Sequence, residues 1–437
     1  MNIANLKNSI DLKPIGQEMY ELIARLYPIC RSITGNGVRQ TLRIIQQLLP
    51  ALNIREVPSG TPVFDWTVPR EWNIRDAYVK NAKGERIIDF QKSNLHVLSY
   101  SVPVRKRMSL AEVKGHLFTL PDYPDWIPYR TSYYKEDWGF CLSHNQFSAL
   151  KDDEYEVCID SSLEDGSLTY GEYFLQGERP DEVLFSCHVC HPSLCNDNLS
   201  GIALVTFLAK HLSVLSRKFS YRFLFIPGTI GSITWLSVNE KRVGNIKNGL
   251  VIACVGDAGG FTYKKSRRGD AEIDRVVMHV LKHSKEKYEL VEFSPYGYDE
   301  RQFCSPGFNL PVGCFMRTPH GRFPEYHTSA DNMDFVRPAC LEESFSVCLS
   351  VLNVLENNRI YLNQNPKCEP QLGKRGLYRS MGGQAKGKLN ELHLLWALNL
   401  SDGHHSLLDI AERAQCEFES ILKAAKSLAA LELLREI

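Results

Sequence analysis

The feature that most constrains the fold is a regular alternation of short apolar runs and amphipathic stretches that begins near residue 181. Apolar runs typical of buried strands lie at residues 183–187, 221–226, 250–255 and 312–316. Between them, apolar residues recur at helical spacing over residues 201–212, 230–240 and 273–286. Because strands that alternate with helices form a parallel or mixed sheet covered on both faces, the sequence predicts an α/β core.

The chain before this core contains two different textures. Residues 17–27 and 38–49 carry apolar side chains at helical spacing, which predicts two helices. Residues 60–120 are rich in Val, Trp, Tyr and Pro and contain short alternating runs such as residues 95–102, which is typical of antiparallel strands. We therefore predict a discontinuous core, residues 1–60 and 151–365, with an inserted β-rich domain at residues 61–150.

The C-terminal part is separated from the core by a segment rich in Pro and Gly, residues 359–388. Three short helices are predicted after it, at residues 389–398, 406–414 and 418–428, and residues 431–437 suit a strand or wing. This order is typical of a winged helix, and we assign residues 366–437 to a linker plus a winged-helix domain.

Charge and cysteine content exclude some classes of function. The 437 residues include 51 basic and 51 acidic side chains, and this zero net charge argues against a partner held mainly by electrostatics, such as nucleic acid or an anionic membrane. No apolar run approaches the roughly 20 residues that a bilayer requires. Thirteen cysteines without an apolar leader suggest reduced thiols, and hence a cytoplasmic protein.

The predicted winged helix is itself close to neutral. Residues 371–437 hold nine basic and eight acidic side chains, whereas a DNA-binding domain usually presents a basic face. We therefore expect this domain to contact a protein partner or a second copy of the chain rather than DNA.

Four residues that could bind a metal follow the strands of the predicted sheet. His188 follows the first strand, Asp197 precedes the next helix, Asp257 follows the third strand and His327 follows the last. Ligands of open α/β sheets bind at the carboxyl ends of the strands, and two imidazoles with two carboxylates suit zinc. Taken singly, three of them have a structural alternative: Asp197 suits a helix N-cap, Asp257 a turn, and His327 a hydrogen-bonded structural histidine.

The motifs around these residues, over residues 181–336, resemble those of the co-catalytic zinc aminopeptidases. They are a strand ending at His188, Asn-Asp197-Asn-x-Ser-Gly, Gly-Asp257 and Tyr-His327-Thr-x-x-Asp331. The clan has the bacterial leucyl aminopeptidase fold, a mixed-sheet zinc-exopeptidase (phosphorylase/hydrolase-like) core, and includes glutaminyl cyclases. The layout of the whole chain also resembles a bacterial aminopeptidase-like family, some members of which accompany polysaccharide-biosynthesis genes.

The resemblance implies roles for the four residues. Asp197 would bridge two metals, His188 and Asp257 would hold one zinc, and His327 the other. However, the place of the clan's two adjacent glutamates, the general base and a zinc ligand, reads Pro227-Gly228-Thr229, and the clan's His-x-Asp reads His188-Val189-Cys190. We therefore expect one zinc rather than two, held by His188 and Asp197 with either His327 or Asp257.

Loss of these glutamates leaves the general base open. Glu300 and Glu325 are equal candidates for it, and Asp299 is a further one that also lies in a loop that lines the substrate pocket in the clan. Tyr326, beside His327, is a second candidate for substrate contact.

Two other segments suggest substrate contacts and have structural alternatives. Tyr133 lies in an aromatic stretch that either lines the cleft or packs the β-rich domain on the core. Arg31 either binds a substrate carboxylate or ties the N-terminal helices together.

Cys190 admits two interpretations. Cys187-x-x-Cys190, with His191 and Cys195, allows a zinc-finger interpretation, but no second ligand pair at set spacing accompanies it. The alternative is a thiol that stands where the clan has a carboxylate, and that orients His188 less firmly.

Two classes of function remain. The first is a zinc-dependent hydrolase of amide or peptide bonds, an aminopeptidase or amidase, in which zinc-activated water attacks the carbonyl of a small peptide, an amino-acid amide or an amino-sugar derivative. The second is a non-peptidase on the same scaffold, either a ligand-binding or regulatory protein with a winged helix, or an acyltransferase or cyclase. Fold alone does not separate them.

Overall fold

The computed structural model describes residues 12–377 and 391–437. The chain divides into two compact units. Among the described residues, the core unit comprises residues 12–274 and 287–346, and the C-terminal unit comprises residues 275–286, 347–377 and 391–437. Each unit is described by itself.

An eight-stranded mixed sheet is the centre of the core unit. Its strands, in spatial order, are β1 (Asn53–Pro58), β10 (Ser167–Leu175), β12 (Ser220–Ile226), β11 (Glu182–His188), β13 (Ile246–Ile252), β16 (Val312–Met316), β14 (Phe261–Lys264) and β15 (Tyr288–Val291). The four central strands, β12, β11, β13 and β16, run parallel to one another. The prediction of an α/β core with a mixed sheet is confirmed.

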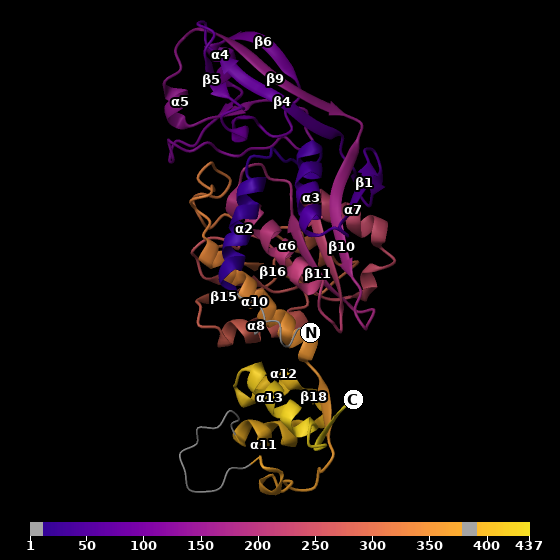
Figure 1. Ribbon diagram of the computed structural model, residues 1–437. Helices are drawn as coiled ribbons and strands as arrows, with labels where there is room; N and C mark the ends of the chain where they lie inside the picture. The colour runs from indigo at the N-terminus through magenta and orange to yellow at the C-terminus, as the bar shows by residue number, and fades with distance from the viewer. Residues whose placement is uncertain (1–11, 378–390) are drawn as a thin grey trace. The chain divides into compact units, whose positions relative to one another are not determined.

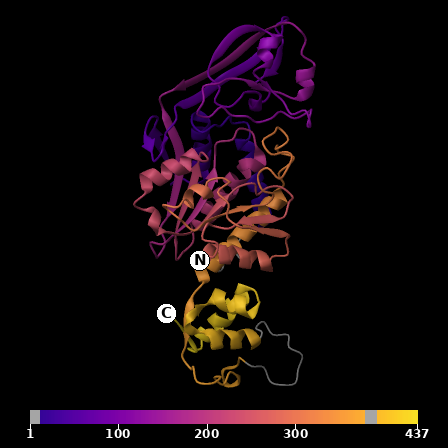
Figure 2. The same ribbon diagram turned by 180° about the vertical axis from the view of Figure 1, so that it is seen from behind.

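Helices cover both faces of this sheet, because its central strands are apolar on both sides. Every residue of β11 and β12 is buried. In Figure 1, α2 (Leu12–Leu26), α3 (Asn36–Leu48) and α6 (Gly201–Leu212) lie on the near side of the sheet, and Figure 2 shows α7 (Ile230–Asn239) from behind. Helix α6 packs on β11, β12 and β13, so its N-terminus lies at the edge where these parallel strands end.

The inserted β-rich domain forms its own antiparallel sheet, in the order β5-β4-β9-β6 (Figure 1). These strands are β4 (Glu71–Lys80), β5 (Arg86–Asp89), β6 (Val104–Ser109) and β9 (Glu154–Glu164). The predicted end of the insertion at residue 150 is wrong, because β9 pairs with both β4 and β6. The alternating run at residues 95–102 is also not a strand, since a 3-10 turn, Asn94–His96, and a loop occupy it.

Short elements complete the core unit. They are β2 (Pro62–Val63), β3 (Trp66–Thr67), α4 (Leu110–Lys114), β7 (Leu117–Phe118), β8 (Phe140–Cys141), α5 (His144–Ser148) and α9 (Glu300–Phe303). Two helices, α8 (Glu272–His283) and α10 (Pro338–Asn357), begin in the core unit and end in the C-terminal unit.

The C-terminal unit contains a winged helix. Its helices are α11 (Glu391–Leu400), α12 (Leu407–Ala414) and α13 (Phe418–Ala429), and its sheet has the order β18-β17-β19, formed by β17 (Ile360–Asn363), β18 (Asp402–Ser406) and β19 (Leu434–Glu436). Because β17 pairs with both other strands, the domain begins before the predicted residue 366. The predicted helix start at residue 389 lies outside the described residues. Ser406 and Asp409 form the capping box that begins α12.

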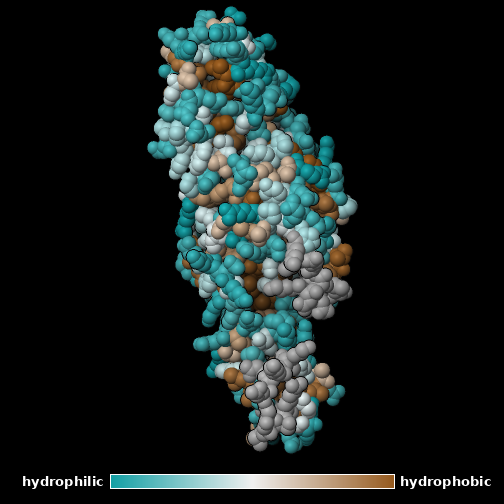
Figure 3. Space-filling model, turned by 60° about the vertical axis from the view of Figure 1, so that its left-hand side comes forward, coloured by the Kyte–Doolittle hydropathy of each residue, from teal (hydrophilic) through white to brown (hydrophobic). Residues whose placement is uncertain are grey.

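One described helix, α10, is long and apolar enough to cross a membrane by length and composition alone. Of its most apolar window, 61% is buried inside the protein, as is usual for a core helix. On the face that Figure 3 presents, hydrophobic side chains form small patches among hydrophilic ones. The predicted cytoplasmic location stays a prediction.

Candidate metal centre

The carboxylate of Asp197 is the centre of a buried polar cluster at the carboxyl edge of the central strands. Its Oδ1 lies 2.9 Å from His188 Nε2 and accepts a hydrogen bond of 2.7 Å from the Tyr298 hydroxyl. Its Oδ2 lies 3.1 Å from His327 Nε2. The structure therefore brings together three of the four predicted ligands, His188, Asp197 and His327.

The elements that hold Asp197 explain how it reaches this position. His188 is the last residue of β11, and Asp197 lies in the kinked turn Cys195–Ser200 that leads into α6, where Asp197 and Asn198 have non-helical dihedral angles. The backbone N–H groups of Asn196 and Asp197 donate hydrogen bonds of 2.6 and 2.9 Å to the carboxylate of Asp331. Asp331 thus fixes the turn, which leaves the Asp197 side chain free to face the histidines.

The inserted domain fixes the loop that carries His327. The backbone N–H of Tyr129 donates to the carbonyl of His327 at 2.7 Å, and that of Ser329 donates to the carbonyl of Ile127 at 2.8 Å. The Tyr129 ring lies edge-on to His327, with centroids 5.1 Å apart. The insertion is therefore part of the site's construction.

Burial and charge oppose each other in this cluster. Burial by itself raises the pKa of Asp197, but His191 and His188 outweigh it and hold that pKa well below its usual range. Burial lowers the pKa of His188, and Asp197 outweighs it and raises that pKa to about 10. For His191, burial prevails and holds the pKa well below its usual value. Burial thus disfavours the charged form of His191, and the neutral imidazole is the form that binds metals.

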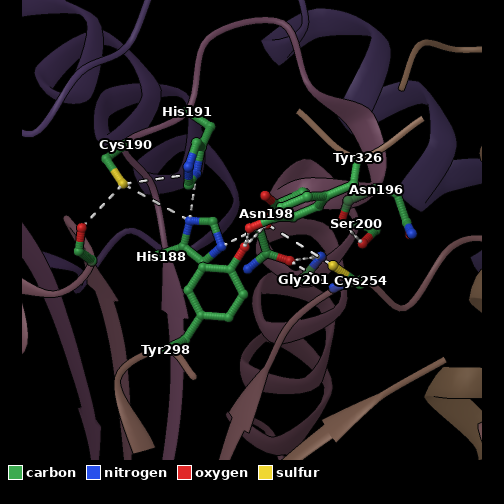
Figure 4. A network of polar contacts seen from close by, with 12 residues as sticks. His188, Cys190, His191, Asn196, Asn198, Ser200, Gly201, Cys254, Tyr298 and Tyr326 are labelled. Carbon is green, nitrogen blue, oxygen red and sulfur yellow. Dashed lines mark hydrogen bonds and ion pairs between the residues drawn. The ribbon is translucent and has the colours of Figure 1, made fainter. Parts of the chain in front are cut away.

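A third imidazole, His191, joins the cluster and links it to Cys190. His191 Nδ1 lies 2.9 Å from His188 Nδ1, and Cys190 Sγ lies 3.8 Å from His191 Nδ1 and 3.9 Å from His188 Nδ1. Figure 4 shows Cys190 and His191 beside the His188 ring, with the Tyr298 ring stacked against it.

Among the residues that the structure describes, two groups of side chains could hold a metal. In each group the donor atoms lie within 4.8 Å of one another. One is His191, Asp197 and His327, and the other is His188, Cys190 and His191. Imidazole nitrogens, a carboxylate and a thiol are the donors that zinc prefers, so the residues fit this metal.

Asp257 lies apart from both sets, and the structure does not support its place as a ligand. Its Oδ1 accepts hydrogen bonds from the Thr318 hydroxyl at 2.6 Å and from the Gly259 N–H at 2.7 Å. Its Oδ2 accepts from the Asn196 amide at 3.0 Å. Because both oxygens are already used, Asp257 supports the loop that holds Asn196, which is the turn role that the sequence left open.

The two glutamates proposed as the general base occupy different settings. Glu300 is fully buried, and its Oε1 pairs with Lys264 Nζ at 2.8 Å, while its Oε2 accepts from the Tyr298 N–H. This ion pair indicates a structural role. Glu325 is half-buried and makes no side-chain hydrogen bond to another described residue.

Asp299 is a fully buried carboxylate with one oxygen unused. Its Oδ1 accepts a hydrogen bond of 2.7 Å from the Ser232 hydroxyl, whereas Oδ2 has no partner among the described residues. A Cβ built on Gly228 would lie 3.4 Å from Oδ2 and 3.2 Å from the Cβ of His188. Asp299 therefore lies beside Gly228, where the clan carries its glutamates, and burial raises its pKa to about 6.

Arg31 is 1% exposed and links the N-terminal helices to the polar cluster around Asp197. Its Nε donates to the carbonyl of His191 at 2.8 Å, and its Nη1 donates to the carbonyl of Leu26 at 2.7 Å. These contacts match the structural alternative that the sequence offered, and contact of Arg31 with a substrate carboxylate stays a prediction.

The two predicted tyrosines lie around the cluster rather than at its centre. The hydroxyl of Tyr133 bonds to that of Tyr129 at 2.9 Å. The hydroxyl of Tyr326 bonds to that of Tyr298 at 2.9 Å, and the Tyr326 ring stacks on His327 with centroids 3.9 Å apart. Both are half-buried, and their contact with substrate stays a prediction.

Sequence reasoning missed two members of the cluster as site residues. His191 entered only through the zinc-finger interpretation, although it lies three residues after His188 in the same strand-to-helix loop. Tyr298 was not identified because it belongs to no motif, and the ionisable residues beside it, Asp299 and Glu300, are the usual candidates for a site.

Comparison with known proteins places the chain in a family. Residues 20–358 match a family described as a domain of unknown function, DUF4910, and residues 359–436 match a winged helix-turn-helix family. A relative from Clostridium acetobutylicum, provisionally named as a polysaccharide biosynthesis protein with an aminopeptidase-like domain, is 60% identical over 96% of each chain.

Solved structures show the same fold. A crystal structure from Clostridium acetobutylicum, provisionally titled a peptidase, is 57% identical, covers 100% of this chain and 98% of its own, and has a TM-score of 0.93. A zinc aminopeptidase from Bacillus subtilis is 13% identical, covers 77% of this chain and 94% of its own, and has a TM-score of 0.56. The chain therefore belongs to the DUF4910 family, with an aminopeptidase-like fold and a C-terminal winged helix-turn-helix.

Proposed function

We propose that this protein is a zinc-dependent hydrolase of amide bonds, of the aminopeptidase or amidase class. The observation that carries the proposal is the convergence of His191, Asp197 and His327 within 4.8 Å at the carboxyl edge of an aminopeptidase-like sheet. His188 completes the cluster from the other oxygen of Asp197. Three ligands with an open fourth position are the arrangement of catalytic zinc sites.

One zinc ion would be held by His191, Asp197 and His327, and would lower the pKa of a bound water and polarise the substrate carbonyl. The chain's own side chains would take up the proton and hold Asp197 in place. Asp299 offers an unpartnered buried carboxylate oxygen that could hold a proton, and Glu325 is the alternative. The Tyr298 hydroxyl holds Oδ1 of Asp197 in place and connects it to Tyr326.

The environment favours a small substrate with an apolar part. The rings of Tyr129, Tyr298 and Tyr326 all lie against the histidines of the cluster, and the His327 side chain is 33% exposed. Amino-acid amides, small peptides and amides of amino sugars fit this description, and the name of the Clostridium relative favours the sugar derivatives.

A second candidate is a non-hydrolytic member of the scaffold, either a regulatory binding protein or an acyl-transfer or cyclising enzyme. The observation in its favour is that Gly228 and Thr229 bring no carboxylate to the place of the clan's paired glutamates. The metal content of the purified chain separates this candidate from the hydrolase.

Metal content of the purified chain tests the hydrolase proposal. We expect about one zinc per chain, and we expect Asp197→Asn to lower zinc affinity at least about tenfold, because the variant removes the only charged oxygen donor of the set. Asp152→Asn, an exposed carboxylate of the insertion, is the control and retains zinc. A chain that neither contains nor takes up zinc would favour the non-hydrolytic candidate.

Activity is then sought with amides of amino acids, N-acyl amino acids and N-acyl amino sugars. Turnover that follows the zinc content across the two variants supports the hydrolase. Stoichiometric zinc without turnover of any amide in this panel would instead favour a binding role.

A further inference from the structure

We propose that Cys190 is a thiolate ligand, and that His188, Cys190 and His191 form a second, sulfur-containing ligand set that binds a soft divalent ion such as zinc, cobalt or cadmium. This inference extends the metal centre of the proposed function and rests on it in part, because the two sets share His191. It assigns to Cys190 a role that differs from orienting His188.

The separations between the three donor atoms are close to those of a tetrahedral ion. A zinc site with its usual bond lengths places two nitrogens about 3.4 Å apart and a nitrogen and a sulfur about 3.6 Å apart. Here the two Nδ1 atoms are 2.9 Å apart, and Sγ lies 3.8 and 3.9 Å from them. Side-chain movements of about half an ångström would bring all three to one ion.

The hydrogen bonding of His188 leaves the correct nitrogen available. Once a metal displaces the Nδ1 proton, His188 keeps Nε2–H toward Asp197 and carries its lone pair on Nδ1, the atom that faces Cys190 and His191. A carboxylate that holds the far nitrogen of a metal-binding histidine is a common supporting contact, since it fixes the tautomer and raises the basicity of the ligand.

The surroundings also suit a negatively charged sulfur. Arg31 is a buried guanidinium that makes no ion pair with a carboxylate among the described residues, and its Nη2 has no hydrogen-bond partner among them. Its Nε donates to the carbonyl of His191, so this unpaired positive charge lies next to the Cys190–His191 segment. Metal binding would release the Cys190 proton to solvent, and Arg31 would lower the free energy of the resulting thiolate.

The alternative role for Cys190 is a simple thiol. Its Sγ lies 3.7 Å from the carbonyl oxygen of Gly228, to which an S–H group donates only a weak hydrogen bond. In the metal-free chain the two facing Nδ1 atoms share an N–H···N hydrogen bond of 2.9 Å, and metal binding would replace this bond and the weak S–H contact with bonds to one ion.

Sharing of His191 sets the stoichiometry. Each imidazole nitrogen with a lone pair serves one ion, so the set with Cys190 and the set with Asp197 and His327 use His191 alternately. The proposal therefore predicts one tightly bound ion per chain, with a sulfur ligand in at least part of the population.

Cobalt(II) titration of the full-length, metal-free chain tests this inference by spectroscopy, without a substrate. A thiolate ligand gives an intense sulfur-to-cobalt charge-transfer band in the near ultraviolet, which nitrogen and oxygen ligands do not give. We expect this band to saturate at about one cobalt per chain. We expect Cys190→Ser and Cys190→Ala to lose it while cobalt still binds through Asp197, His327 and His191.

Cys254→Ser is the matched control, because the Cys254 thiol is also buried and lies 3.9 Å from Asp197 Oδ1. We expect the band to persist in this variant and in His327→Ala, which leaves the sulfur set intact. Circular dichroism before titration establishes that each variant is folded.

The outcomes separate this inference from the proposed function. Cobalt binding without a charge-transfer band in the wild type, or a band that persists in both Cys190 variants, would overturn the sulfur ligand and leave the hydrolase proposal standing. A wild-type chain that binds neither cobalt nor zinc would overturn both.

Discussion

At the residue scale, the carboxylates around the Asp197 cluster carry the same charge but differ in their ion-pair and hydrogen-bond partners. Glu300, Asp299 and Asp257 follow strands or begin a helix in ways that look alike in sequence. In the structure, Glu300 is neutralised by Lys264, Asp257 is held by hydroxyl, amide and backbone donors, and Asp299 keeps a free oxygen. Which of them can act depends on partners that lie far away in the chain.

Asp299→Asn is the first test at this scale. Burial raises the pKa of Asp299 to about 6, so its carboxylate is able to accept a proton above that pH and is protonated below it. Once an amide substrate is found, we expect the variant to lower kcat about 100-fold with zinc content unchanged. Wild-type activity should fall as the pH drops through about 6, and this acid limb should be absent in the variant. An unaltered kcat would direct attention to Glu325.

Glu300→Gln is the second test, and it should act on stability. The variant leaves the Lys264 ammonium buried without an opposite charge, which costs about 3 kcal/mol. We expect a lower urea midpoint, with zinc affinity close to that of the wild type. A stable variant with much lower kcat would instead return Glu300 to the catalytic group.

At the element scale, two contacts between elements are open to test, and the first is a close approach of the backbone. Gly35 precedes α3 at a φ of 94°, and a Cβ there would lie 2.0 Å from the carbonyl oxygen of Trp72 in β4. The junction between the N-terminal helices and the inserted sheet therefore requires glycine, for reasons of both conformation and space.

Gly35→Ala should therefore destabilise the core unit by about 3 kcal/mol, because the helix and the strand must separate to admit the methyl group. Gly60→Ala is the control, since Gly60 also has a positive φ, 80°, but has no atom within 4 Å of its Cβ position. Thermal unfolding of the two variants gives the comparison, and equal losses would show that only the dihedral angle matters.

The second element-scale contact lies in the C-terminal unit, where His279 of α8 accepts a hydrogen bond from the N–H of Phe418, the first residue of α13. Burial lowers the pKa of His279 from 6.5 to about 4. Between these values the unfolded chain binds a proton that the folded chain does not. The contribution to stability is therefore complete above about pH 6.5 and is lost as the pH falls toward 4.

Hydrogen exchange of the α13 amides, corrected for the intrinsic rate, should show this loss, with protection lower by about 2 kcal/mol at pH 4.5 than at pH 7.5. His279→Gln keeps an acceptor that does not titrate, so it should remove most of the dependence. His393→Gln, on α11 of the same unit, should retain it. The same pH dependence in His279→Gln would mean that another group is responsible.

At the scale of the whole molecule, the winged helix poses a question about partners. Its near-neutral charge predicts that DNA does not bind, and we propose a protein partner or a second copy of the chain instead. Gel shift with mixed genomic DNA at low salt should show no complex, while sedimentation velocity should show self-association if the partner is a second copy. Tight, salt-sensitive DNA binding would contradict this prediction.

The sequence by itself determined the classes of element and much of the site. Apolar runs and helical spacing identified the central strands and α6, because burial on both faces leaves a pattern in the chain. The ends of these elements placed His188, Asp197 and His327 at one edge, since parallel strands end together. It also identified the winged helix, whose three helices have strongly amphipathic or apolar patterns.

Only the tertiary structure decided where the inserted domain ends and which side chains meet at the site. The insertion ends with β9, whose partners β4 and β6 precede it by many residues, so no local pattern marks that boundary. Asp257 is held by Thr318 and Asn196 outside both sets of candidate donor atoms, and His191 lies in both sets, because such a set depends on distances between side chains. Local spacing records which face a residue occupies, whereas the partner it meets there depends on the packing of distant segments.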